Sequence, residues 1–220
     1  MSKTPVKIMI IDDHPLVRQG MKKVIEKEND FTVIHEAGSA DEAIRLIGQE
    51  PPDLAIVDIS LDSETNGLEL VKALRDRYGS IRTLVLSMHD ENIYAERALR
   101  SGARGYVAKK EGPSVIIDAI RTVMSGELYL GSRISMKIID RMFQGREGNA
   151  ESPVQALSDR ELEIFQMIGE GTGTGDIAHR LNISVNTIES HRKKIKEKLG
   201  IEKGSELVKA AVEWVSSQRK

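Results

Sequence analysis

Two adjacent carboxylates, Asp12 and Asp13, directly follow the apolar run 8–11. Like charges this close repel each other, and partial burial at a strand end makes it more costly to ionise both. Further polar side chains follow other apolar runs, namely Asp58, Ser87 and Lys109. A single Asp after a strand is usually a turn residue or a helix cap, so this set becomes significant if its members meet in space.

If they meet, the three carboxylates, the hydroxyl and the ammonium are suited to hold a divalent cation and a phosphoryl group. A hard cation such as Mg²⁺ prefers oxygen ligands and would relieve the repulsion between the acids. A carboxylate can also act as a nucleophile and form an acyl phosphate. The Lys109 ammonium and the Ser87 hydroxyl would then meet the charge on the phosphoryl oxygens.

The elements that must position these residues are visible as an alternation of apolar runs and helical patterns over the first 126 residues. We expect strands at 7–11, 31–35, 54–57, 83–86 and 105–108. We expect helices at 15–28, 40–49, 67–78, 91–101 and 114–125, the second of them opened by a capping box of Ser39 and Glu42. Continuously apolar strands are buried on both faces, which is typical of a parallel sheet. The pattern predicts an α/β domain, a five-stranded doubly wound parallel sheet, with a ligand site at the carboxyl ends of its strands.

The remainder of the chain has a different pattern. Residues 127–153 are predicted to be a linker with a short helix within 135–143, because 144–153 is polar, contains glycine and ends in proline. Residues 154–220 show no strand pattern, so we expect a second, small all-helical domain. A capping box of Ser158 and Glu161 opens its first helix, and further helices are expected at 175–181, 185–199 and 203–216.

Two of these helices, 175–181 and 185–199, are separated by a short break and form a helix-turn-helix pattern. The second has five Lys or Arg against one Glu within 191–198. Its outer face is predicted to present Thr187, Glu189, Ser190, His191, Arg192, Lys193 and Lys194. A cationic run on a helix is usually only a solvated face, but its place in this motif favours entry into the major groove of DNA.

Six residues of the first domain together resemble the signature of a two-component receiver domain over residues 6–126: Asp12, Asp13, Asp58, Ser87, Tyr106 and Lys109. The resemblance implies that Asp58 accepts phosphate from a sensor histidine kinase. It implies a Mg²⁺ site made by Asp13, Asp58 and the backbone carbonyl of Ser60, with Asp12 assisting through water.

The same resemblance implies that Ser87 contacts the phosphoryl group, that Lys109 pairs with it, and that Tyr106 is an aromatic switch that turns inward on activation. The loop after the phosphate acceptor departs from the family pattern. Leu61-Asp62 stands where Met-Pro is usual, and there is one extra residue before Gly67.

The tail resembles the LuxR-type DNA-binding domain in the segments LSDRELEI (157–164), DIA (176–178), LNIS (181–184), NTIESH (186–191) and KLG (198–200). The whole chain therefore resembles a NarL/FixJ-type response regulator, a phosphorylation-activated transcription regulator whose only catalysis is its own phosphorylation and dephosphorylation. The resemblance implies that Glu189, Ser190 and Lys193 face bases, and that Thr187, His191 and Lys194 face phosphates. It also implies a homodimer when phosphorylated, with helix 203–216 at the contact, and double-stranded DNA and RNA polymerase as partners.

Two positions of the tail depart from the family pattern. Thr172-Gly-Thr-Gly-Asp176 stands where Ser-Asn-Lys-Glu is frequent, and Glu189 replaces a frequent Lys. An acid at that place could accept from a cytosine amino group, which would change the preferred DNA sequence.

Composition and the acid set also bear on the class of protein. The chain has no cysteine and no apolar run near the ~20 residues of a membrane span, so we expect a cytoplasmic protein without disulfides. One alternative function is that of a haloacid-dehalogenase-type phosphatase with Asp58 as nucleophile, but Ser60 stands where that family has a second acid. The other is that of a DNA-binding protein whose first domain serves only for dimerisation.

Overall fold

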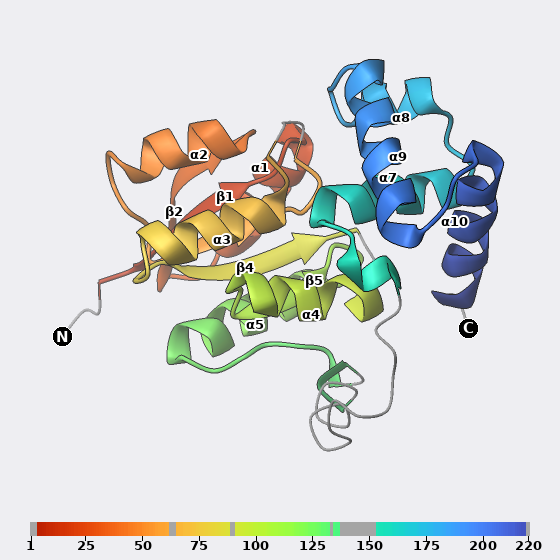
Figure 1. Ribbon diagram of the computed structural model, residues 1–220. Helices are drawn as coiled ribbons and strands as arrows, with labels where there is room; N and C mark the ends of the chain where they lie inside the picture. The colour runs from red at the N-terminus through yellow and green to blue at the C-terminus, as the bar shows by residue number, and fades with distance from the viewer. Residues whose placement is uncertain (1–3, 62–64, 89–90, 133, 137–152, 219–220) are drawn as a thin grey trace. The chain divides into compact units, whose positions relative to one another are not determined.

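The computed structural model describes residues 4–61, 65–88, 91–132, 134–136 and 153–218 (Figure 1). The chain divides into two compact units, Met1–Ile139 and Asp140–Lys220. None of the helices in the described ranges is long and apolar enough to cross a membrane. The predicted helix within 135–143 lies mostly outside the described residues.

The first unit is a doubly wound parallel sheet, as predicted. Its strands are β1 (Val6–Ile11), β2 (Phe31–Ala37), β3 (Leu54–Val57), β4 (Arg82–Ser87) and β5 (Gly105–Ala108), all paired in parallel in the order β2-β1-β3-β4-β5. The helices are α1 (Pro15–Ile25), α2 (Ala40–Ile47), α3 (Gly67–Arg77), α4 (Glu91–Ser101) and α5 (Pro113–Ser125). Helices cover both faces of the sheet, with α1 and α5 on one face and α3 beside α4 on the other (Figure 1).

Burial on both faces explains the continuously apolar strands. Ile8 and Ile10 point into the core beneath α1 and α5, together with side chains of β3, β4 and β5. Met9 and Ile11 alternate with them along β1 and are equally buried. Removing this much apolar surface from water is the main force that holds the sheet between its helices.

The start of α2 follows the prediction in part. Ser39 caps the helix, because its hydroxyl accepts from the backbone N–H of Glu42. The Glu42 carboxylate, however, accepts from the N–H of Gly38 rather than from that of Ser39, so the reciprocal bond of a capping box is shifted by one residue.

The chain after α5 returns to the sheet, which the sequence pattern did not predict. Tyr129 lies beside β5: its carbonyl oxygen accepts from the N–H of Tyr106 at 3.0 Å, and its N–H donates to the carbonyl oxygen of Arg104 at 3.0 Å. Two residues later, the N–H of Gly131 donates to Oε1 of Glu91 at the start of α4, at 2.8 Å. The segment 128–131 is therefore joined to both β5 and α4.

At Gly67 the backbone passes too close to the backbone of Asp58 and Ile59 to leave room for a side chain. A Cβ added there would lie 1.8 Å from the carbonyl oxygen of Asp58, so we expect Gly67→Ala to lower the free energy of unfolding by roughly 1–3 kcal/mol or more. Urea denaturation followed by circular dichroism measures this. The control is Gly20→Ala on the exposed face of α1, where an added Cβ meets nothing within 4 Å. There, the higher helix propensity of Ala should raise the free energy of unfolding by up to about 1 kcal/mol. Equal destabilisation by both substitutions would contradict the prediction.

The second unit is helical throughout its described residues, as predicted. A short 3₁₀ turn, Pro153–Ala156, precedes α7 (Asp159–Gly169), α8 (Thr174–Arg180), α9 (Val185–Leu199) and α10 (Gly204–Gln218). The capping box of Ser158 and Glu161 is confirmed, with both reciprocal hydrogen bonds present. The core is formed by apolar side chains from all four helices, among them Phe165, Ile177, Ile188, Ile195 and Leu207.

Candidate functional site

The carboxyl ends of four strands bring the predicted polar residues of the first unit together. Asp12 follows β1 and Asp58 follows β3, and these two strands pair directly, with Ile11 opposite Val57. Ser87 ends β4, and its carbonyl oxygen accepts from the N–H of Lys109, which follows β5. Asp12, Asp58 and Ser87 are 1 %, 3 % and 0 % exposed, so the two carboxylates are removed almost completely from water.

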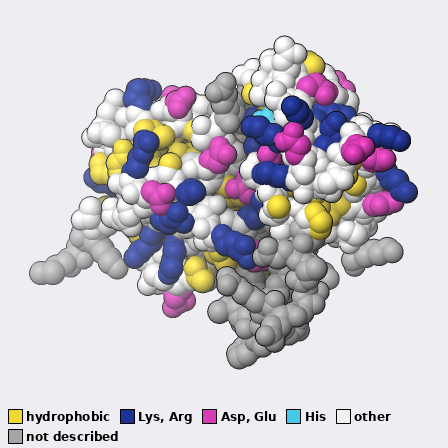
Figure 2. All heavy atoms as spheres, viewed as in Figure 1, with side chains coloured by type: hydrophobic (Ala, Val, Ile, Leu, Met, Phe, Trp, Pro, Cys, Tyr) yellow, Lys and Arg dark blue, Asp and Glu magenta, His cyan; other side chains and the backbone are white. Residues whose placement is uncertain are grey.

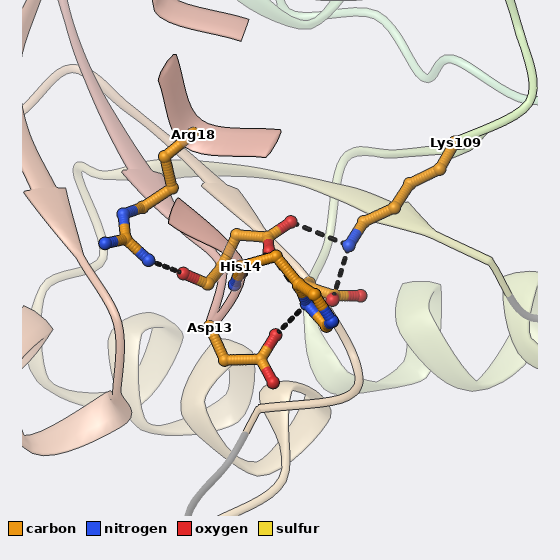
Figure 3. A network of polar contacts seen from close by, with 6 residues as sticks. Asp13, His14, Arg18 and Lys109 are labelled. Atoms are coloured by element: carbon orange, nitrogen blue, oxygen red, sulfur yellow. Dashed lines mark hydrogen bonds and ion pairs between the residues drawn. The ribbon is translucent and has the colours of Figure 1, made fainter. Parts of the chain in front are cut away.

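The Lys109 ammonium is the centre of this group. Its Nζ lies 2.7 Å from Oδ2 of Asp12 and 2.6 Å from Oδ2 of Asp58 (Figure 3). Burial alone would lower the pKa of Lys109, but the attraction of the two carboxylates outweighs it and the pKa is raised. Lys109 therefore stays charged and fixes the spacing of the two acids.

One ammonium does not balance the carboxylates around it. Burial raises the pKa of Asp58 to about 7, and the attraction of Lys109 offsets this only in part. Burial also raises the pKa of Asp13, against the effect of the neighbouring His14. The raised pKa values arise mainly from burial, with a smaller part from the neighbouring carboxylates, and a bound cation would favour the charged form of both acids.

The donor set fits such a cation. Asp12, Asp13, His14 and Asp58 each offer one ligand atom, and these atoms all lie within 4.8 Å of one another. Oxygen ligands predominate, which is the chemistry that Mg²⁺ prefers. Ser60, predicted to give a backbone carbonyl, is half-buried two residues after Asp58.

Two residues at this site had no predicted role. Arg18 on α1 donates from Nη1 to the backbone carbonyl oxygen of Asp12. The backbone N–H of His14 donates to Oδ1 of Asp12 at 2.8 Å. The ring nitrogen Nδ1 of His14 lies 2.5 Å from Oδ1 of Asp13 (Figure 3). The only sequence signal for His14 is its position immediately after the acid pair. For Arg18, the signal is its position one helical turn after Pro15, the first residue of α1.

Tyr106, the predicted aromatic switch, lies on β5 with its side chain 1 % exposed. Its N–H donates to the carbonyl oxygen of Tyr129. Any shift of the backbone at this point of β5 would thus act directly on the segment 128–131.

The helix-turn-helix motif of the second unit is formed by α8, a turn and α9. The turn contains Asn182 with a φ of 46°, a left-handed conformation that Asn tolerates better than most residues. Ser184 then caps α9 by accepting from the N–H of Thr187, and its hydroxyl lies 2.8 Å from the Thr187 hydroxyl. Five predicted DNA-facing residues of α9 are exposed: Thr187, Glu189, Ser190, Lys193 and Lys194.

The other two predicted residues of α9 are half-buried. Arg192 donates from Nη1 to the Thr174 hydroxyl at 3.3 Å, and its Nε lies 3.5 Å from Glu189, so it ties α9 to α8. Burial lowers the pKa of His191, and the nearby cations Arg160 and Lys194 lower it further, so the imidazole is neutral near pH 7. On the face that Figure 2 shows, the cations of this unit are interspersed with acidic side chains.

Comparison with known proteins agrees with this arrangement. The family described as response regulator receiver domain matches residues 8–121, and the family of bacterial regulatory proteins, luxR family, matches residues 155–211. The oxygen regulatory protein NreC of Staphylococcus aureus is 33% identical over 210 residues, which cover 94% of this chain and 97% of that protein.

Solved structures extend the comparison. A LuxR-family two-component response regulator from Aurantimonas sp. SI85-9A1 is 32% identical, with a TM-score of 0.58 over 64% of this chain and 99% of that one. RcsB from Salmonella enterica serovar Typhimurium, bound to a promoter in the presence of phosphomimetic BeF3−, is 26% identical, with a TM-score of 0.62 over 94% of this chain and 98% of that one. The chain belongs to the two-component response regulators that join a receiver domain to a LuxR-type DNA-binding domain and act as phosphorylation-dependent transcription regulators.

Proposed function

We propose that Asp58 of this chain accepts a phosphoryl group from a sensor histidine kinase, and that the phosphorylated chain binds double-stranded DNA as a homodimer through α9. The observation that carries the proposal is the convergence of Asp12, Asp58 and Lys109 at buried strand ends, where the ammonium lies within 2.7 Å of an oxygen of each carboxylate. Such a site is suited to hold and read a phosphoryl group.

The chemistry follows from the positions of these side chains. A carboxylate oxygen of Asp58 attacks the phosphorus of the phosphohistidine, the P–N bond breaks, and the imidazole leaves with its electron pair and takes up a proton. Mg²⁺, when bound, supplies positive charge against the phosphoryl oxygens. Asp13, Asp58 and the carbonyl of Ser60 would hold the ion, with Asp12 assisting through water.

The remaining residues of the site would respond to the phosphoryl group on Asp58. Lys109 is within reach of a phosphoryl group on Asp58 because it already contacts the carboxylate, and Ser87 at the end of β4 would donate its hydroxyl. Tyr106 is proposed as the aromatic switch that turns inward on activation, although its side chain already lies inward in this structure. Hydrolysis of the acyl phosphate returns the site to its starting state, so the only catalysis is the chain's own phosphorylation and dephosphorylation. The phosphatase alternative lacks support, because Ser60 supplies no second carboxylate.

In DNA binding, Glu189, Ser190 and Lys193 would face base edges, and Thr187 and Lys194 would face phosphates. His191 would join them as a neutral N–H donor. Arg192 would act indirectly, by holding α8 against α9. The structural relative bound to a promoter supports this use of the motif.

Dimerisation is supported by an apolar strip on α10, where Val208 and Val212 are 41% and 44% exposed one helical turn apart. A structure described as two RcsB dimers bound to two parallel DNAs shows a relative in that state. The dimer on its promoter would then contact RNA polymerase.

A phosphotransfer assay tests the proposal. With acetyl phosphate and Mg²⁺, intact-mass spectrometry should show one added phosphoryl group on the wild type and none on Asp58→Ala. Asp76→Ala, at an exposed acid of α3, is the matched control and should label like the wild type. Full labelling of Asp58→Ala, or full labelling of the wild type in EDTA, would refute the assignment.

A further inference from the structure

We infer that His14 is a metal ligand, and that its imidazole makes the acidic site prefer transition cations such as Mn²⁺ over Mg²⁺. The inference rests on the metal site of the proposed function and adds a nitrogen donor to the oxygen ligands named there. It concerns which divalent ion the site selects, rather than whether the site binds one.

The backbone places the His14 ring among the acids. His14 is the residue before α1, with extended backbone (φ −89°, ψ 107°), and Pro15 follows as the first helical residue. Its side chain makes no capping hydrogen bond to the helix, so the ring is free of the usual role at this position. The N–H donates instead to Oδ1 of Asp12, which turns the residue back over the strand end.

The ring nitrogen faces carboxylate oxygens although much of the side chain is exposed. Nδ1 lies 2.5 Å from Oδ1 of Asp13 and 3.5 Å from Oδ1 of Asp12, and the side chain is 65% exposed (Figure 3). Lys109 binds the other oxygen, Oδ2, of Asp12 and also Oδ2 of Asp58. The ammonium and the imidazole therefore lie next to different oxygens of Asp12. Lys109 can keep its contact with Oδ2 while His14 and Oδ1 face a cation.

The distances suit a shared ion. Two neighbouring ligands of an octahedral ion, each at about 2.1 Å, lie about 3 Å apart. The pair formed by Asp13 Oδ1 and His14 Nδ1, now 2.5 Å apart, would need only a small opening to place both atoms on one cation, which would replace the direct contact between them. The ligand atoms of all four donor residues already lie close enough together for one ion.

The consequence is a change in selectivity. Mg²⁺ prefers oxygen ligands and gains little from an imidazole, whereas divalent transition ions gain more from one, with Mn²⁺ at the weak end of their series. An all-oxygen site would discriminate weakly between Mg²⁺ and Mn²⁺. With His14 as a ligand, the ratio of the Mn²⁺ affinity to the Mg²⁺ affinity should be about tenfold higher than without it.

The test uses the full chain, Mn²⁺ and pulsed electron paramagnetic resonance. The wild type should show ¹⁴N modulation from a directly bound imidazole, and His14→Phe, which keeps a ring but removes the donor, should bind Mn²⁺ without it. Titration with Mn²⁺ and Mg²⁺ should show the affinity ratio falling about tenfold in His14→Phe, with little change for Mg²⁺. His35→Gln is the control, because the His35 ring, on β2, bonds to the backbone carbonyl of Glu50.

The outcomes separate the two claims. Mn²⁺ bound without ¹⁴N modulation, or an unchanged affinity ratio in His14→Phe, would show that His14 only orients Asp13 and would overturn this inference alone. Failure of the wild type to bind either ion would overturn the inference and the metal site of the proposed function together.

Discussion

Replacing Asp58 with Asn is expected to stabilise the metal-free receiver unit above pH 7, by up to about 4 kcal/mol. Burial raises the pKa of Asp58 from 3.8 to about 7, and a pKa difference of one between the folded and unfolded states is worth about 1.4 kcal/mol. Between these two values the folded state binds more protons than the unfolded state, so the free energy of unfolding of the wild type falls as pH rises from about 4 to about 7. Asn does not titrate and is free of this loss.

The measurement is urea denaturation in EDTA at about pH 4.5, 6 and 8, chosen to span the window between the two pKa values. Circular dichroism follows both units, and the fluorescence of Trp214 on α10, the only tryptophan, follows the second unit separately. The difference between Asp58→Asn and wild type should grow with pH in the first signal only. Mg²⁺ should then stabilise the wild type at about pH 8 and have little effect on Asp58→Asn. Parallel pH profiles for the two proteins would contradict the raised pKa.

The second large effect is expected on α9. Lys194→Ala should weaken binding to all DNA sequences, because a phosphate contact carries no sequence information. In a dimer two contacts are lost, so the slope of log affinity against log salt should fall by about two. Glu189→Ala should instead change which base pair is preferred, by about 1–3 kcal/mol at one position of each half-site.

These effects can be measured by fluorescence anisotropy with the phosphorylated full chain, across a salt series and a panel of single-base variants of the bound site. Lys72→Ala on α3 is the matched control: an exposed lysine of the first unit, outside both α9 and the proposed dimer contact on α10. If Lys194→Ala binds like Lys72→Ala, then α9 does not lie along the DNA backbone in the proposed way.

Much of the first unit could be predicted because its strands are short, apolar and separated by clear helical patterns. Once the strands are parallel, the carboxyl ends of β1, β3, β4 and β5 must share one edge, so the meeting of Asp12, Asp58, Ser87 and Lys109 follows from topology alone. In the same way, capping boxes indicate where helices begin, and glycines such as Gly126 and Gly200 indicate where they end.

The details that depend on side-chain packing could not be predicted. Periodicity does not show that Lys109 would bridge two carboxylates, or that the His14 ring would turn toward Asp13 instead of into solvent. In the second unit, Arg160 on α7 is buried, bonded to Glu163 and to the carbonyl of Leu181, although a charged face at the start of a helix usually lies in water. Such pairings arise from the tertiary fold, which local sequence does not encode.

The return of Tyr129 to β5 has a consequence for how this chain can be divided. β5 is the last strand of the sheet, and an uncovered last strand offers unpaired N–H and C=O groups to which another chain can add. Tyr129 takes up the N–H of Tyr106 and the carbonyl of Arg104, so it blocks strand addition at this side. A fragment cut at residue 126, where the helical pattern ends, would uncover β5 and invite aggregation. A fragment that continues to residue 136 would keep it covered.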